Sequence, residues 1–311
     1  MVGAALAAGP ANALEPFVLG RHECWIRSLD FSPDGAVLAA AGGVLDRHDE
    51  LILWDLASGR KRLARLNENT CLEAARFSRD GQWLAVVHRD QTVKLLDART
   101  GSEETRFSCT PAWRQCFAFS ADSRQFLVLN ADGSLAVWNM AEKRLRVEPP
   151  PGPGQWLVYA RGREALMTGQ TWSGVAISIW DLAARKELVH LEMPTFAIWA
   201  ACFSPDGDTL ALGTDEGAVY FCHLPSRRVW STQVNEAERI NCLAFSPDAR
   251  TLVSGGQDHT VKLWDVATGE PIGALGKHDA AVFAVAFAPD GRRVASGGFD
   301  KLVRLWETPS P

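Results

Sequence analysis

The chain of 311 residues is 47% hydrophobic and 22% charged, with a formal net charge of −5 at pH 7. This composition is typical of a globular protein that buries a sizeable core. The negative charge argues against a surface that follows nucleic-acid phosphates, because such a surface needs a basic stripe. No run of about 18 apolar residues indicates a transmembrane helix. We therefore predict no nucleic acid and no membrane among the partners.

The first 13 residues, MVGAALAAGPANA, are small and weakly apolar. We expect residues 1–13 to form a flexible tail and the protein to be cytoplasmic. The alternative is a signal-peptide remnant, because "ANA" resembles a signal-peptidase site; it would make the protein periplasmic or exported. Against it, no Lys or Arg precedes that site. Seven cysteines without CxxC spacing also favour a reducing compartment with buried free thiols.

Two series of residues repeat along the chain, the first with a period of 42 residues and the second at intervals of 40 to 46 residues. The anchors of the first series are Trp54, Leu96, Trp138, Trp180, Cys222, Trp264 and Trp306. Upstream of them stand the turns FSPDG at 31, FSRDG at 77, FSADS at 119, YARGR at 159, FSPDG at 203, FSPDA at 245 and FAPDG at 287. Self-similarity at a fixed period is the signature of a repeat architecture.

Each unit predicts four short strands. In the unit that starts at Ile240, INCLAFS alternates apolar and polar residues, and PDA turns the chain. TLVSGG, TVKLWDV and PIGALG follow as further strands, separated by QD and ATGE. Four antiparallel strands in about 42 residues is the size of a propeller blade. We predict an all-β, seven-bladed β-propeller over residues 14–308, with 309–311 as a tail.

The closure of the ring is predicted from the two ends of the repeat region. The last unit ends at KLVRLWETPSP, a third strand with no fourth behind it. The first unit is preceded by LEPFVLGRH, which matches the fourth-strand stretch EPIGALGKH. The N-terminal strand is therefore expected to complete the last blade.

The sequence resembles the WD-repeat β-propeller family over residues 14–308. The matching features are Trp54-Asp55, Trp180-Asp181 and Trp264-Asp265, and the GxH starts that end at His22 and His278. The short FSPDG-type turns suggest a bacterial style of repeat. The resemblance implies a hydrogen-bond network of His278, Asp300, Ser296 and Trp306 in the last blade. Other units depart from the pattern: Glu236 replaces His, and Leu96 and Cys222 replace Trp.

Catalytic motifs such as GxSxG, HExxH and the P-loop are absent from the sequence, and we predict no enzyme and no cofactor. The longer first unit gathers Asp46, His48, Asp49 and Glu50. A histidine with carboxylates suits a metal. We nevertheless predict a solvated polar loop and no metal, because the spacing matches no known ligand motif.

The resemblance implies that the loops before the first strand and the loops between second and third strands of each unit share one face. On the 42-residue grid, this face receives Trp25, Arg27, Arg89, Trp113, Gln115, Trp172, Trp199, Asp215, Arg239, Asn241, Gln257, Phe283 and Phe299. Aromatic and arginine enrichment is typical of an interface. The alternative is that some rings pack into the central channel.

We therefore predict a non-enzymatic scaffold that binds a protein or peptide on this face, as a monomer or as a subunit of a larger complex. The alternative is a propeller sensor or enzyme with a small-molecule or metal site at the central channel. That alternative needs His or carboxylate side chains from several first strands. These strands are mostly apolar, as in VFAVAF.

Overall fold

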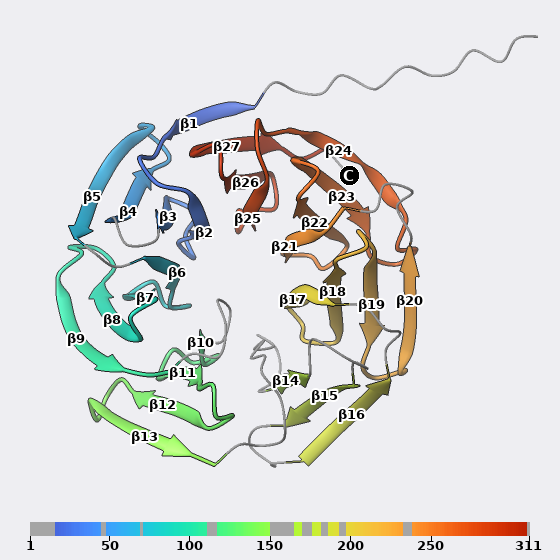
Figure 1. The fold of residues 1–311 in the computed structure, drawn as a ribbon, viewed down its shortest axis with the longest axis horizontal. Coiled ribbons are helices and arrows are strands. Elements are labelled where there is room, and N and C mark those ends of the chain that lie inside the picture. The colour runs from blue at the N-terminus through green and yellow to red at the C-terminus, as the bar shows by residue number, and fades with distance from the viewer. Residues whose placement is uncertain are drawn as a thin grey trace, which may run out of the picture.

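A computed structural model of the chain describes residues 16–44, 48–68, 71–110, 117–149, 165–169, 176–181, 186–192, 197–232 and 238–309. All regular secondary structure in these residues is β-strand. The strands form sheets that stand around a central axis like the blades of a propeller (Figure 1). Within these ranges, no helix is long and apolar enough to cross a membrane.

Strands occupy four positions from the axis outward. The inner strands are β2 (Ile26–Phe31), β6 (Leu72–Phe77), β10 (Phe117–Phe119), β17 (Ile198–Phe203), β21 (Ile240–Phe245) and β25 (Val282–Phe287). The second strands are β3 (Val37–Val44), β7 (Trp83–His88), β11 (Gln125–Leu129), β14 (Ala165–Gly169), β18 (Thr209–Thr214), β22 (Thr251–Gly256) and β26 (Arg293–Gly298). The third strands are β4 (His48–Asp55), β8 (Thr92–Asp97), β12 (Leu135–Asn139), β15 (Ala176–Asp181), β19 (Val219–His223), β23 (Thr260–Asp265) and β27 (Leu302–Glu307). The outer strands are β5 (Arg60–Glu68), β9 (Glu103–Ser108), β13 (Arg144–Glu148), β16 (Lys186–Glu192), β20 (Arg228–Thr232), β24 (Pro271–Lys277) and β1 (Phe17–Arg21).

Sequence neighbours pair antiparallel within each sheet. Six sheets of the described residues are four-stranded blades, and β14, β15 and β16 form a sheet of three strands. The turn YARGR, expected to follow the first strand of this unit, lies outside the described residues. The prediction of an all-β propeller with four-stranded antiparallel blades is confirmed.

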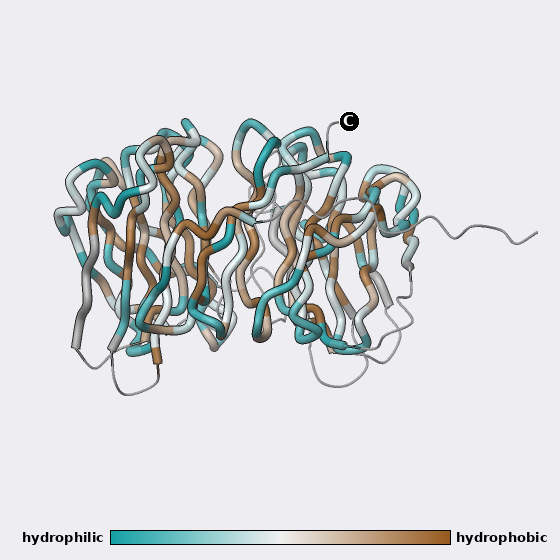
Figure 2. Tube along the Cα trace, turned by 90° about the horizontal axis from the view of Figure 1, so that it is seen from above, coloured by the Kyte–Doolittle hydropathy of each residue, from teal (hydrophilic) through white to brown (hydrophobic). Residues whose placement is uncertain are grey.

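The hydrophobic core lies between consecutive sheets. One cluster joins Leu38 and Ile52 of one blade to Val303 and Leu305 of its neighbour. Leu38 and Ile52 are fully buried, and each such side chain contributes about 1.5–3 kcal/mol to folding. In the side view, hydrophobic segments run through the disc and hydrophilic turns lie toward its two faces (Figure 2). Because both sides of a sheet are covered, second strands such as β18 are buried along their whole length.

The FSPDG-type turns are held by a repeated set of hydrogen bonds. In the first of them, the Ser32 hydroxyl donates to Asp34 at 2.6 Å and accepts from the amide of Val37 at 2.9 Å. The amide of Ala36 also donates to Asp34. The hydrogen bond from Ser32 lowers the pKa of the Asp34 carboxyl. The Asp of the motif therefore serves the turn itself, as its position in the sequence predicts.

The first described strand completes the last blade. β1 pairs antiparallel with β27, with Phe17 opposite Leu305 and Arg21 opposite Leu302. The amide of His22 then donates to the carbonyl of Lys301 at 2.8 Å. Residues from the start and the end of the described chain thus share one sheet, which we call the closing blade (β25, β26, β27 and β1).

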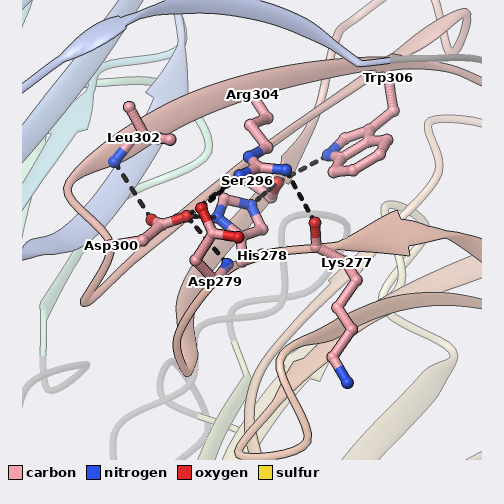
Figure 3. Close-up of polar contacts among 8 residues, drawn as sticks. All are labelled: Lys277, His278, Asp279, Ser296, Asp300, Leu302, Arg304 and Trp306. Atoms are coloured by element: carbon pink, nitrogen blue, oxygen red, sulfur yellow. Dashed lines mark hydrogen bonds and ion pairs between the residues drawn. The ribbon is translucent and has the colours of Figure 1, made fainter.

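A hydrogen-bond chain fixes the core of the closing blade (Figure 3). The Trp306 indole donates to the Ser296 hydroxyl at 2.6 Å, and that hydroxyl lies 2.6 Å from His278 Nε2. His278 Nδ1 lies 2.7 Å from a carboxylate oxygen of Asp300. Because Ser296 accepts from the indole, its own proton is available for Nε2, and the Nδ1 proton for Asp300. The chain joins the loop before β25, the end of β26, the following turn and β27.

Glycine in the GxH motif is required by the tryptophan of the next blade. A methyl carbon added to Gly276 of β24 would lie 2.6 Å from Cη2 of Trp306 and closer still to Cζ3. In the same way, a methyl carbon on Gly20 of β1 would lie 2.6 Å from Cζ2 of Trp54. Each glycine thus lets an outer strand lie directly on the indole of the following blade.

Candidate interaction face

The starts of four described inner strands, β6, β17, β21 and β25, are tied to the turn after the second strand of the same blade by a repeated backbone hydrogen bond. The amide of Gln257 donates to the carbonyl of Arg239 at 2.8 Å, and the amide of Phe299 donates to Ala281 at 3.0 Å. The same bond joins Arg89 to Cys71 and Asp215 to Ala197. Both sets of predicted loops therefore lie on one face of the ring, which we call the loop face.

The described residues of the predicted set fall into these loops and the adjoining strand starts. Trp25 and Arg239 directly precede inner strands, and Arg27, Trp199, Asn241 and Phe283 are the second residues of inner strands. Arg89, Asp215, Gln257 and Phe299 lie in turns after second strands. Trp113, Gln115 and Trp172 lie outside the described residues.

Three aromatic rings gather where the closing blade meets the next blade. The Phe299 ring lies 4.5 Å from the Trp25 ring and stacks on Phe283 with centroids 4.4 Å apart. Phe299 is 37% exposed, whereas Trp25 and Phe283 are half-buried. We call these three residues the aromatic cluster. Stacked rings with exposed surface are typical of interface hot spots.

Arg239 forms a second group beside this cluster. Its guanidinium lies over the Trp199 ring at 4.2 Å from the centroid. Its Nε donates to Asn241 at 2.9 Å, and Nη2 donates to Gln257 at 3.3 Å. The amide of Asn241 donates in turn to the carbonyl of Val282, the residue before Phe283. The structure thus brings Trp199, Arg239, Asn241 and Gln257 together and connects them to the aromatic cluster.

A third group contains the predicted Arg27 and Arg89 together with Glu73. Glu73 was missed in the sequence, because it belongs to the next blade from Arg27. Glu73 of β6 lies 3.6 Å from Arg27 and 3.5 Å from Arg89, so that one carboxylate serves two guanidinium groups. Arg89 keeps 54% of its side chain exposed. Glu73 lies four residues before the turn FSRDG at 77, as Arg27 lies four residues before FSPDG at 31, and this equivalence in the sequence could have identified it.

The central channel contains a cavity of about 250 Å³. The residue before the last of each described inner strand lines it: Asp30, Arg76, Ala118, Cys202, Ala244 and Ala286. Asp30 and Arg76 are engaged with the blades, because Asp30 accepts from the amide of Phe77 and Arg76 donates to the carbonyl of Leu29. Among the described residues of the lining, Asp30 is the only carboxylate and histidine is absent.

The structure contradicts the prediction that the acidic stretch of the first blade is a solvated loop. Glu50 is buried and lies 3.0 Å from His22, which accepts a long 3.4 Å hydrogen bond from Trp54. Asp49 is also buried and lies 3.3 Å from His88 of the next blade. These carboxylates therefore belong neither to a solvated loop nor to a shared metal site. Asp46 lies outside the described residues, and no group of three or more metal-ligating side chains occurs within them.

The blade of β21–β24 has Glu236 at the sequence position that His278 occupies in the next unit. The side-chain hydrogen bonds of this blade differ from those of the closing blade. Trp264 still donates to Ser254 at 2.8 Å. Asp258, however, pairs with Lys262 at 2.7 Å and accepts from the Thr260 hydroxyl. Glu236, which stands at the histidine position, lies outside the described residues.

Comparison with known proteins gives matches along most of the chain. The family "WD domain, G-beta repeat" matches residues 15–55 and 61–97, and "Anaphase-promoting complex subunit 4 WD40 domain" matches residues 201–290. The chain is 27% identical over 234 residues to "Probable U3 small nucleolar RNA-associated protein 18" of Schizosaccharomyces pombe, covering 69% of the chain and 44% of that protein. It is 24% identical over 205 residues to "Periodic tryptophan protein 2" of Arabidopsis thaliana, covering 64% and 22%.

A shorter match is found to "Small ribosomal subunit protein RACK1" of Glycine max. It is 32% identical over 84 residues, which is 27% of the chain and 24% of that protein. The chain thus spans less than half the length of each of these relatives. All three come from eukaryotes, so the comparisons lend no support to a bacterial style of repeat.

Proposed function

Because the chain belongs to the WD-repeat β-propeller family, we propose that it is a non-enzymatic scaffold that holds a protein partner on its loop face. The aromatic cluster beside Arg239 is the observation that carries this proposal. Exposed, stacked rings next to an arginine have the composition of a binding hot spot. The ring of blades is rigid, so that a partner binds with little ordering of the scaffold.

The relatives support a place in a larger assembly. The names of two of them refer to a small nucleolar RNA and to the small ribosomal subunit. We propose that this chain also acts as a subunit of a complex, with a protein as its direct partner. The absence of nucleic-acid partners and the cytoplasmic location remain predictions from composition and from the N-terminal residues.

Seven blades are our proposed count. The described residues form seven sheets, and β14–β16 pair in the same antiparallel order as three strands of a blade. The repeat period assigns the inner strand of this unit to the segment that ends at YARGR. A chain spanning 14–308 with seven complete blades follows from this assignment.

Affinity purification from the native cell lysate tests the scaffold. Wild type is compared with Trp25→Ala/Trp199→Ala/Phe283→Ala and with the control Val147→Ser/Val229→Ser. The control removes side chains that are 63% and 43% exposed on outer strands, away from the loop face. A protein held by wild type and the control but lost by the triple variant supports the loop face. Equal retention by the two variants places the partner elsewhere, and retention of nothing by wild type argues against a scaffold.

The alternative function, a small-molecule sensor at the channel, would use the central cavity. Its volume of about 250 Å³ lies below the ~300–1,000 Å³ usual for drug-sized ligands. The charged groups of the described lining are Asp30, Arg76 and Arg79, and Asp30 and Arg76 are already bonded to the blades, which leaves few polar groups for a ligand or a reaction. A thermal-shift screen of metabolites distinguishes this function, because a channel ligand stabilises Ala244→Trp less than wild type.

A further inference from the structure

We infer that the loop face recognises a partner segment that carries an acidic side chain beside an aromatic or large apolar one. This inference rests on the proposed scaffold function and specifies the chemistry of its partner. The acidic side chain pairs with Arg239, and the apolar one packs on the aromatic cluster of Trp25, Phe283 and Phe299.

Arg239 is held in place by groups that carry no charge. Trp199 supports the flat side of its guanidinium, and the side-chain oxygens of Asn241 and Gln257 accept two of its N–H groups. Arginine loses rotamer entropy when it is ordered, and here the protein has already incurred that loss. A partner that binds this guanidinium therefore meets a preorganised cation.

Arg239 lacks a counter-charge within the described residues. It forms no ion pair there, and its contacts are to Trp199, Asn241, Gln257 and the backbone. Two nearby carboxylates of the loop face are engaged locally: Asp215 accepts from the amide of Ala197, and Asp258 pairs with Lys262. A guanidinium has five N–H groups, of which the described side chains use two. The remaining donors suit a carboxylate, which arginine binds in a fork-like geometry.

A chain of contacts through Asn241 joins the cation to the aromatic cluster. Asn241 accepts a hydrogen bond from Arg239 and donates one to the carbonyl of Val282. Phe283 is the residue after Val282 in β25. Phe283 stacks on Phe299, which contacts Trp25. One short extended segment can therefore place an acidic and an apolar side chain on the two groups together.

A second positive centre lies beyond Trp25. Arg27 and Arg89 share Glu73, so these three side chains carry one net positive charge. The aromatic cluster thus stands between two positive centres. This arrangement complements a segment with acidic residues on both sides of an apolar anchor. Arg239 defines the main acidic contact, because Arg27 and Arg89 already pair with Glu73.

Protein fits these observations better than single-stranded RNA. RNA-binding surfaces offer separate ring faces for successive bases and a run of cations along the backbone. Here Phe299 stacks on Phe283 at 4.4 Å and packs in a tilted arrangement on Trp25 at 4.5 Å, and the chain has a formal net charge of −5.

The test uses a phage library of random 12-residue peptides selected on the full chain. Selections on wild type are compared with those on Arg239→Gln and on the matched control Arg228→Gln. Arg228 is an exposed arginine that also stacks on a tryptophan, Trp230, at 5.0 Å, but it lies on the outer strand β20. We expect wild type and the control to enrich Asp or Glu next to an aromatic or large apolar residue, and Arg239→Gln to lose the acidic preference.

Fluorescence anisotropy of the leading labelled peptide then measures the contact. We expect Arg239→Gln to weaken binding about tenfold, as does Asp→Asn in the peptide on wild type. The two changes together should cost little more than one. Unchanged thermal midpoints exclude unfolding of the variants, and Arg239→Lys, which keeps the charge but loses the fork, should bind with intermediate affinity.

Three results overturn the inference, each with a different meaning for the scaffold. Enriched peptides that depend on Trp25 and Phe299 but lack acidic residues contradict the predicted acidic contact with Arg239. They still support the proposal that the scaffold binds its partner on the loop face. Peptides insensitive to Arg239, Trp25 and Phe299 contradict the face itself. Binding of a labelled 20-nucleotide oligouridylate that depends on Arg239, in the absence of any enriched peptide, replaces the protein partner by RNA.

Discussion

Substitution of Gly276 by alanine should destabilise the closing blade through the Trp306 ring. The added methyl carbon would overlap Cζ3 and lie 2.6 Å from Cη2 of that ring. The ring cannot move away freely, because its nitrogen donates to Ser296, which contacts His278. Overpacking costs about 1–3 kcal/mol, and a broken buried hydrogen bond costs about 1–3 kcal/mol. The two costs are not fully additive, because a ring that moves and breaks its hydrogen bond also relieves the overpacking; we expect a combined loss of about 2–4 kcal/mol in the free energy of unfolding.

The thermal midpoint provides the assay. An unfolding entropy of about 2.1 cal/mol/K per residue gives about 0.65 kcal/mol/K for 311 residues. The expected loss therefore lowers the midpoint by about 3–6 °C. Trp306→Phe, which removes the overlapping part of the ring, should make Gly276→Ala nearly neutral in the double variant. A midpoint within 1 °C of wild type, or an equal cost of Gly276→Ala in both backgrounds, would refute the reasoning.

Two further predictions concern the closing blade. Deletion of residues 15–21 removes β1, including buried Leu19, and should lower the thermal midpoint by several degrees. The control Phe17→Ser, at a 61% exposed site, should not lower it. An unchanged melting curve after the deletion contradicts closure by this strand. Burial alone would raise the pKa of Asp300, but its hydrogen bonds, first that of His278, lower the pKa below its ordinary value. The resulting stabilisation is present above the unfolded pKa of about 3.9 and is lost as the pH falls through the folded pKa. Thermal midpoints of wild type and Asp300→Asn should therefore differ by a constant amount above about pH 5 and converge below about pH 4; a gap that widens in acid contradicts this.

Much of the fold was predictable because each unit carries its own local signals. A turn needs Ser, Pro, Asp and Gly at fixed positions, and the hydroxyl of Ser32 and carboxylate of Asp34 indeed bond the turn that they belong to. The last unit was also the one whose residues matched the family pattern most fully. Its His278, Asp300, Ser296 and Trp306 form a continuous hydrogen-bond chain.

Contacts between units were harder to predict, because no local signal specifies the partner. Asp49 of one blade lies against His88 of the next. Glu50 lies beside His22, as Asp300 lies beside His278 in the closing blade. Sequence spacing placed Asp49 and Glu50 in one acidic loop, whereas β-strand pairing sends them to different neighbours. The binding chemistry of the loop face likewise depends on Asn241 and Gln257, whose ordering of Arg239 only geometry reveals.

The closing blade also has a consequence for synthesis on the ribosome. β1 emerges first, but its partner β27 is made about 285 residues later. At about 5–20 residues per second, the delay is about 15–60 s. During that time Leu19 and Trp54 lack the apolar neighbours Val303 and Leu305 that cover them in the finished ring. The nascent chain therefore exposes an unpaired apolar edge until β27 has been translated, and this edge is open to aggregation during that time.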